Sequence, residues 1–218
     1  MKTEFMIIAL DGGAATGKST TAHLLAKQAH LMHVDTGSHY RALTHLLLQA
    51  DIPAEDSRIQ ATLNTITLDT VVDEYMATLE IDGATLDTSS LRSETVNRNV
   101  SDYASIPSLR EKLKSYQRHQ KDVAKAHDFA GLVMEGRDIG TVIFPDADLR
   151  VWLEADPSVR KARRASEGSV DTIEERDRLD SGRTHAPLRY SAGALRINTT
   201  ENPPDTVVNT ILKACENS

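Results

Sequence analysis

The segment with the clearest chemical signature is a glycine-rich stretch near the start of the chain. Residues 12–19 read Gly-Gly-Ala-Ala-Thr-Gly-Lys-Ser and fit the pattern G-x-x-x-x-G-K-[ST] at every fixed position. In this pattern backbone N–H groups at a helix N-terminus wrap nucleotide phosphates, the lysine reaches the β- and γ-phosphates, and the hydroxyl holds Mg²⁺. We therefore predict that ATP or GTP is bound by Gly12, Gly13, Ala14, Ala15, Thr16, Gly17, Lys18, Ser19 and Thr20.

A metal-bound phosphate also needs a carboxylate near the ends of the strands. Residues 132–135 form an apolar stretch of strand length that ends in Glu135. We predict that Glu135 orients water around Mg²⁺ held by Ser19. The alternative is a glutamate at the end of a strand that faces solvent. Asp11, directly before the glycines, is expected to shape the loop rather than to carry chemistry.

Arginine is concentrated late in the chain, where ten of the sixteen arginines fall between Arg137 and Arg196, against one lysine. Phosphoryl transfer needs alignment, exclusion of water and positive charge on the phosphoryl oxygens, and the planar guanidinium donates two parallel hydrogen bonds to a phosphate. The candidate phosphate ligands are Arg41, Arg137, Arg176 and Arg183. Each has the alternative of a solvated or salt-bridged surface residue. In the basic stretch 160–164 we expect some side chains to face solvent and one to touch ATP.

Other chemistry receives little support from the sequence. The eight histidines show no metal-ligand spacing with cysteine or acidic residues, and we assign them no catalytic role. Cys215 is the only cysteine, which excludes an internal disulfide and a cysteine-based zinc site. Spacing also reveals no pair of nucleophile and base.

The elements that position these residues follow from the hydrophobic pattern. Phe5–Leu10 is a continuous apolar run, typical of a strand buried on both faces of a parallel sheet. A helix from Ser19 to Ala29 and a strand from Leu31 to Val34 complete a βαβ unit. Further strands are predicted at residues 132–135, 149–154 and, more weakly, 195–198. Strands that alternate with helices predict an α/β fold with a parallel sheet.

One section departs from this pattern. Residues 66–72, 78–82 and 83–86 alternate apolar and polar residues, and Asp82-Gly83 is a strong two-residue hairpin signal. We therefore predict a small antiparallel insert. Helices predicted at residues 93–104 and 107–126 follow it, and Pro107 suits a first helical turn.

Composition limits the class of protein. The chain has 218 residues, enough for one large domain or one domain with a small insertion, and its net charge is −7. An acidic chain is not expected to bind nucleic acid as its main partner, because that binding relies on basic surfaces. The run Phe5–Leu10 is too short for a signal peptide or a membrane span, so we expect a cytoplasmic protein with no membrane partner.

Several blocks together resemble the bacterial cytidylate kinase family, and the resemblance runs nearly end to end. It rests on the glycine-rich loop, residues 35–41 (Asp-Thr-Gly-Ser-His-Tyr-Arg), Ser101 followed by Pro107 and Arg110, residues 135–141 (Glu-Gly-Arg-Asp-Ile-Gly-Thr) leading to residues 144–147 (Phe-Pro-Asp-Ala), and residues 176–188. Gly13 departs from the family, which often has proline there, and Leu179 stands where a basic residue is common.

The resemblance implies an α/β P-loop kinase. It has a parallel sheet core flanked by helices, a small antiparallel insert in the monophosphate-binding region and a helical lid. Within a single domain of residues 1–218 it implies a core at 1–55, 128–165 and 184–218, an insert at about 56–127 and a lid at about 166–183.

The resemblance also implies roles for individual residues. Asp138 would accept a hydrogen bond from the exocyclic amine of cytosine, and Arg110 and Ser101 would read the neighbouring edge of the ring. Asp180 would meet the sugar hydroxyls. The implied ligands of CMP are Thr36, Arg41, Ser101, Arg110, Arg137, Asp138, Arg176, Asp180 and Arg183, and the implied catalytic residues are Lys18, Arg137, Arg176 and Arg183.

The implied activity is transfer of a phosphoryl group from Mg-ATP to CMP or dCMP, giving ADP and CDP or dCDP. Mg²⁺ is the implied cofactor, and a monomer is expected because one chain would carry both nucleotide pockets. Two alternatives stay open: a P-loop kinase for another acceptor such as UMP or a small metabolite, and a P-loop switch module that hydrolyses nucleotide slowly.

Overall fold

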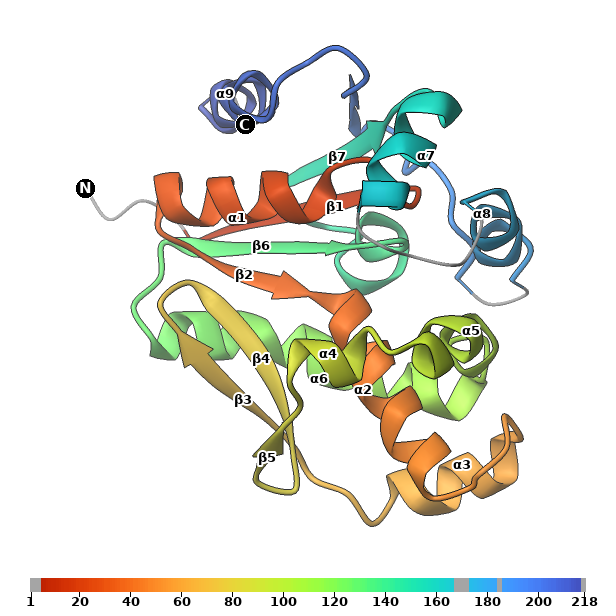
Figure 1. The fold of residues 1–218 in the computed structure, drawn as a ribbon. Coiled ribbons are helices and arrows are strands. Elements are labelled where there is room, and N and C mark those ends of the chain that lie inside the picture. Colours follow the sequence, from red (N-terminus) through yellow and green to blue (C-terminus); the bar gives the residue numbers. More distant parts are fainter. Residues whose placement is uncertain (1–4, 167–172, 184–185, 217–218) are drawn as a thin grey trace.

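The computed structural model describes residues 5–166, 173–183 and 186–216, with the backbone alone for residues 173–176 (Figure 1). The described strands are β1 (Met6–Gly12), β2 (Leu31–Asp35), β3 (Leu68–Asp73), β4 (Met76–Ile81), β5 (Ala84–Thr85), β6 (Gly131–Gly136), β7 (Leu149–Glu154) and β8 (Leu195–Asn198). The described helices are α1 (Lys18–Ala29), α2 (Thr36–Gln49), α3 (Asp56–Leu63), α4 (Thr88–Leu91), α5 (Glu94–Tyr103), α6 (Pro107–Ala126), the π-helix η1 (Ile139–Ile143), α7 (Pro157–Ser166), α8 (Ile173–Ser181) and α9 (Pro204–Cys215).

The strands form one sheet in the order β3-β4-β2-β6-β1-β7-β8, with β5 beside β4. From β2 to β8 all neighbours are parallel, which confirms the predicted α/β fold class. The strands predicted at residues 149–154 and 195–198 and the helix predicted at 107–126 have the predicted bounds. The first predicted strand extends further than expected, because Asp11 and Gly12 still pair with β7.

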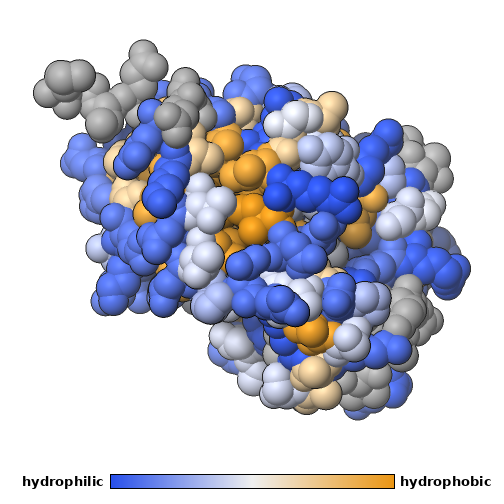
Figure 2. Space-filling model, turned by 90° about the horizontal axis from the view of Figure 1, so that it is seen from above, coloured by the Kyte–Doolittle hydropathy of each residue, from blue (hydrophilic) through white to orange (hydrophobic). Residues whose placement is uncertain are grey.

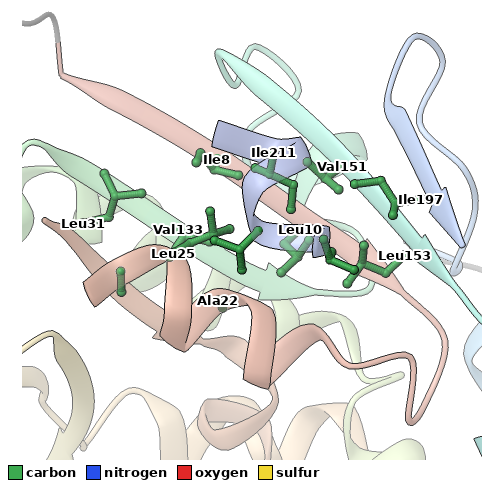
Figure 3. Close-up of a cluster of buried hydrophobic side chains, with 13 residues drawn as sticks. Ile8, Leu10, Ala22, Leu25, Leu31, Val133, Val151, Leu153, Ile197 and Ile211 are labelled. Carbon is green, nitrogen blue, oxygen red and sulfur yellow. The ribbon is translucent and has the colours of Figure 1, made fainter. Parts of the chain in front are cut away.

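Apolar side chains cover both faces of the central strands, as expected for a parallel sheet between helices. Figure 3 shows one face, where Ile8, Leu10 and Val133 meet Leu25 of α1 and Ile211 of α9. On the other face a second cluster includes Ala124 of α6 and the first and last residues of η1. The two clusters hold the central strands between helices on both sides.

The predicted antiparallel insert is present, and the structure adds how it joins the main sheet. The antiparallel pair β3–β4 is confirmed, and the turn after β4 has the positive φ values of Asp82 (50°) and Gly83 (81°) that a two-residue hairpin turn needs. However, β4 also lies parallel to β2, with His33 opposite Met76, so the insert extends the main sheet instead of forming a separate small one. The pairing of β4 with β2 depends on hydrogen bonds between strands that are distant in the sequence. The apolar pattern of either strand alone does not predict it.

Helix α2 and the π-helix η1 are among the elements that were not predicted. Helix α2 begins after Asp35, whose side chain accepts hydrogen bonds from the backbone N–H groups of Gly37 and Ser38. The π-helix η1 begins at Ile139, where the Asp11 carboxylate accepts from the N–H groups of Ile139 (2.9 Å) and Gly140 (2.7 Å). Asp11 therefore shapes the turn after β6 and not, as expected, the glycine-rich loop.

The surface agrees with a chain whose apolar residues are mostly inside. Among the described residues the large hydrophobic side chains that are exposed are Val71 and Tyr190. Hydrophilic side chains dominate the face seen in Figure 2, with hydrophobic atoms gathered near its centre. None of the helices that the structure describes has the length and apolar character needed to cross a membrane.

His39 makes the stability of this fold sensitive to acid. Its ring is fully buried in α2 against the Tyr116 ring, and within the described part of the chain neither ring nitrogen has a hydrogen-bond partner. Burial lowers the pKa of His39 from 6.5 to about 4, although the Asp35 charge opposes this shift.

We therefore expect the free energy of unfolding to decrease as the pH is lowered from about 6.5 to about 4. The reason is that His39 takes up a proton near pH 6.5 in the unfolded chain but only near pH 4 in the folded chain. Over that interval His39 accounts for a loss of up to ~3 kcal/mol, and His39→Leu should remove that part of the pH dependence. Urea unfolding of both proteins across this range measures it. An equal slope in the variant would assign the acid sensitivity to other groups.

Candidate active site

A cleft of about 380 Å³ lies where the sequence predicts the site, at the carboxyl ends of the parallel strands. Most predicted site residues line it: Ala14, Ala15, Thr16, Gly17, Lys18, Ser19, Thr20, Thr36, Arg41, Ser101, Glu135, Arg137, Asp138, Asp180 and Arg183. Gly12, Gly13 and Arg110 are not among the residues that line it. The side chain of Arg176 in α8 is outside the described residues. The predicted donor and acceptor residues therefore share one cleft.

The glycine-rich loop joins β1 to α1 and has the conformation that its glycines permit. Gly17 has φ 88°, in the left-handed region that favours glycine. A Cβ atom at Gly12 would lie 2.3 Å from the carbonyl oxygen of Leu153, so only glycine fits beside β7. Lys18 is buried and its Nζ donates to the carbonyl oxygen of Gly13 (2.7 Å). Burial, with the nearby charge of Arg137, lowers the pKa of Lys18 to about 7.

The oxygen donors expected around a metal lie together at the start of α1. Glu135 is 3% exposed, so the alternative of a solvent-facing glutamate is wrong. Ser19 Oγ donates to Glu135 Oε2 (2.9 Å). In the part of the chain that the structure describes, no group of three or more histidine, cysteine, aspartate or glutamate residues could hold a metal ion. A hydroxyl and one carboxylate fit Mg²⁺, which commonly takes one or two protein ligands and shares the rest with phosphates and water.

On the acceptor side, Asp138 forms a buried ion pair with Arg110. Arg110 Nη2 donates to Asp138 Oδ2, and Arg110 Nη1 donates to the carbonyl oxygen of Ala104 (3.0 Å). The Arg110 guanidinium also lies over the Tyr40 ring, 5.4 Å from its centroid. Burial raises the pKa of Asp138, and Arg110 and Arg183 act against this rise. Asp138 thus presents a carboxylate to the cleft, while Arg110 supports it from behind.

Asp180 brings two of the predicted phosphate ligands together. Its Oδ2 accepts from Arg137 Nε (2.8 Å) and its Oδ1 from Arg183 Nη2, and it is almost fully buried. Arg137 Nη1 also donates to the carbonyl oxygen of Gly12 (3.0 Å), which ties β6 to the loop. Two arginines are therefore held side by side at the cleft wall, facing the loop that carries Lys18.

The other predicted ligands are held by short contacts to the surrounding elements. Arg41 Nη1 donates to Asn97 Oδ1 (2.6 Å), which links α2 to α5. Thr36 Oγ1 donates to the carbonyl oxygen of Glu135 (2.7 Å) and so joins the start of α2 to β6. Both contacts join segments far apart in the sequence, so they hold elements of the cleft to one another.

Comparison with known proteins identifies the family. The family described as cytidylate kinase matches residues 8–217 of the chain. The cytidylate kinase of Listeria monocytogenes serovar 1/2a is 37% identical over 225 residues, 98% of this chain and 97% of that protein. That of Chlorobaculum tepidum is 37% identical over 224 residues, 94% of this chain and 91% of that protein. The chain belongs to the cytidylate kinase family.

A solved structure supports the fold of this cytidylate kinase family member. An uncharacterized protein from Eubacterium ventriosum aligns with a TM-score of 0.51 over 98% of this chain and 99% of that chain. The two sequences are 14% identical, so the likeness shows the fold alone. The predicted resemblance to the cytidylate kinase family is confirmed by the family match and not by this structure.

Sequence reasoning missed several residues of the cleft in this cytidylate kinase family member. Tyr40, Arg92 and Arg164 line it; no role was predicted for Tyr40, and no motif included Arg92. Arg164 belongs to the basic stretch of α7, whose other members differ in position: Arg160 pairs with Asp177, whereas Lys161 is exposed. Tyr40 could have been found, because it stands beside Arg41 in the motif at residues 35–41.

The departure at Gly13 has a structural counterpart. A Cβ atom there would lie 2.8 Å from Arg160 Nη1 and 3.2 Å from Asp177 Oδ2. Asp177 Oδ1 accepts a hydrogen bond from the backbone N–H of Ala14 (3.2 Å), so the Arg160–Asp177 pair rests directly on the loop. A glycine at this position leaves room for that pair.

The Arg110–Asp138 pair generates a stability prediction. Arg110→Met removes the cation and leaves Asp138 buried without its main partner, so the free energy of unfolding should fall by roughly 3 kcal/mol. Arg98→Met, which removes the exposed partner of Glu94, is the control and should change it by under ~0.5 kcal/mol. Urea unfolding at neutral pH gives both values. Equal, small losses would mean that solvent reaches the Arg110 pair.

Proposed function

We propose how the cleft carries out the activity of its family. As a member of the cytidylate kinase family, the chain is a nucleoside monophosphate kinase that phosphorylates CMP with ATP as donor. The observation that carries the mechanism is that the glycine-rich loop with Lys18 and the Arg110-supported carboxylate of Asp138 meet in one cleft. Two nucleotides bound there permit direct in-line transfer, which needs no covalent enzyme intermediate.

ATP binds at the loop between β1 and α1. The backbone N–H groups of residues 14–20 surround its phosphates at the N-terminus of α1, and Lys18 moves from the Gly13 carbonyl to the β- and γ-phosphates. Ser19 directly, and Glu135 through water, would hold Mg²⁺ beside these phosphates. When bound, Mg²⁺ offsets the negative charge of the β- and γ-phosphate oxygens.

CMP binds on the Asp138 side of the cleft. The Asp138 carboxylate accepts a hydrogen bond from the exocyclic amine of cytosine, and Ser101 contacts the neighbouring edge of the ring, while Arg110 acts through Asp138. Uracil places a carbonyl oxygen where cytosine has the amine, so its binding leaves the buried carboxylate facing another acceptor. Arg110 holds Asp138 in place and favours its charged form. The sugar hydroxyls meet Asp180, and dCMP is accepted as well.

The phosphate of CMP and the transferring phosphoryl group lie among Arg41, Arg137, Arg176 and Arg183. Asp180 orients the guanidinium groups of Arg137 and Arg183 before the phosphate arrives. Phosphate oxygens then replace some of the hydrogen bonds that the two arginines make with the Asp180 carboxylate. Thr36 stays on the Glu135 carbonyl and fixes the start of α2 next to the acceptor. This arrangement places positive charge on the oxygens that carry the charge of the transition state.

The segment at about 166–183 acts as a lid and the segment at about 56–127 as the monophosphate-binding insert of a single domain. Support for the lid comes from α8, which supplies Asp180 to the cleft and Asp177 to the loop. Closing the lid brings Arg176 to the phosphoryl group and keeps water from attacking it. The cytoplasmic location and the monomeric state stay predictions.

Base recognition is tested with an assay that measures ADP release from Mg-ATP in the presence of CMP, dCMP, UMP, AMP or GMP. We expect CMP and dCMP to stimulate release strongly and the purines little. Asp138→Asn should lower the preference of kcat/KM for CMP over UMP by roughly tenfold or more, the effect of one mismatched buried hydrogen bond.

Two outcomes contradict parts of this mechanism. An unchanged ratio of CMP to UMP in Asp138→Asn would remove Asp138 from base recognition while leaving the family activity in place. Equal rates with all five monophosphates would favour another phosphate acceptor, or a P-loop switch that hydrolyses ATP on its own.

The charge contacts are tested by Lys18→Ala and Arg183→Ala. Each should lower kcat by on the order of 10² to 10⁴, because a preorganised charge at the transition state contributes about that much elsewhere. Lys27→Ala, in the last turn of the same helix as Lys18 and exposed, is the control and should leave kcat unchanged. If kcat stayed within about twofold while KM rose, these side chains would bind substrate and transition state equally.

A further inference from the structure

A buried histidine lies directly beneath the Ser19–Glu135 pair. His33, the third residue of β2, is 3% exposed. Side chains alternate along a strand, and the neighbours of His33 on its face of the sheet, Leu31 and Val133, belong to the apolar cluster under α1. An apolar residue would fit this row, so a polar ring here needs another explanation than packing.

The ring contacts the carboxylate that the mechanism assigns to Mg²⁺. His33 Nε2 lies 2.9 Å from Glu135 Oε1, and Ser19 Oγ donates to the other oxygen, Oε2, at 2.9 Å. The two oxygens of Glu135 therefore have different partners, one in the sheet and one in the glycine-rich loop. An ionised carboxylate only accepts, so Nε2 is the donor.

The other ring nitrogen, Nδ1, indicates that the contact of Nε2 with Glu135 is the reason why a histidine occupies this apolar position. Among the described residues His33 Nδ1 is buried without a hydrogen-bond partner. Burying an unpaired nitrogen lowers stability, and the Nε2 contact with Glu135 is the ring's one compensation that the described residues show.

The backbone makes His33 a fixed point. It lies opposite Val133 of β6 on one side and Met76 of β4 on the other, and its N–H donates to the carbonyl oxygen of Tyr75 (2.6 Å). Glu135 sits two residues beyond Val133 on the same face. A ring anchored in the interior of the sheet can therefore determine the rotation of the carboxylate above it.

We propose that His33 is a positioning residue for the metal-bound nucleotide. Its Nε2–H holds Glu135 Oε1 and so directs Oε2 to Ser19 and to the water that Glu135 shares with Mg²⁺. Partners that orient a metal-binding carboxylate in this way commonly change metal affinity by 10- to 100-fold when removed. The inference rests on the proposed role of Glu135 and Ser19 at Mg²⁺.

The test uses two variants of nearly equal length and shape. His33→Gln keeps a side-chain N–H donor, whereas His33→Met fills the same apolar row without one. Calorimetry measures the affinity for ATP, without any monophosphate, in Mg²⁺ and in excess EDTA. In the wild type we expect tighter binding with Mg²⁺, and His33→Met should lose about tenfold or more of that gain. Affinity in EDTA should stay within about twofold, and His33→Gln should recover most of the loss.

His39→Phe is the matched control, because His39 is equally buried but does not touch Glu135. It should keep the wild-type gain from Mg²⁺. If His33→Met does not fold, as judged by circular dichroism, His33→Leu replaces it.

Three results would overturn the proposal. If His33→Met keeps the wild-type gain in ATP affinity from Mg²⁺, His33 has no positioning role. If His33→Met loses ATP affinity equally in Mg²⁺ and in EDTA, its role is structural only. Equal losses in His33→Gln and His33→Met would show that the donor is not what matters. Glu135→Gln distinguishes failure of the His33 proposal from failure of the proposed function. If Glu135→Gln keeps the gain in ATP affinity from Mg²⁺, the proposed metal role of Glu135 is wrong. If Glu135→Gln loses this gain but His33→Met keeps it, the metal role of Glu135 stands and only the proposed role of His33 is wrong.

Discussion

The parallel pairing of β1 with β6 is the constraint on which the rest of the site depends. It sets Leu10 opposite Glu135 and Asp11 opposite Gly136, so the loop after β1 and the turn after β6 leave the sheet at the same edge. A Cβ atom at Gly131 would lie 2.1 Å from the Met6 carbonyl oxygen, which shows how closely the two strands approach. Through this pairing Ser19 reaches Glu135, and Lys18 and Asp138 line the same cleft.

Around this edge the chain buries more charge than stability alone would favour. Asp138 with Arg110, and Asp180 with Arg137 and Arg183, are ion pairs of low exposure. Pairs of this kind gain little stability over apolar residues, because their desolvation nearly cancels their attraction. Their value lies in fixed direction: each holds a carboxylate or guanidinium where a base or a phosphate oxygen must arrive. Removing one partner leaves a buried charge and costs far more than the pair contributes.

At this edge Glu135 connects three parts of the structure. Its side chain contacts the glycine-rich loop through Ser19 and the interior of the sheet through His33, and its carbonyl oxygen accepts a hydrogen bond from Thr36 at the start of α2. Asp11 plays a comparable part on the opposite strand by holding the first N–H groups of η1. Each carboxylate lies next to backbone that turns away from the sheet, so the turns that carry the site are held by the strands that precede them.

The sequence by itself determined the loop chemistry, the central strands and the parallel architecture, because short-range patterns encode them: a fixed glycine spacing, continuous apolar runs and a proline at the start of α6. It also determined the family, through several motifs read together. Only the tertiary structure decided how β4 joins β2, that Asp11 holds η1, and that His33 and Asp177 lie at the site. These depend on contacts between residues up to about 160 positions apart, as between Ala14 and Asp177, and no local pattern records which distant backbone or side chain will satisfy a buried polar group.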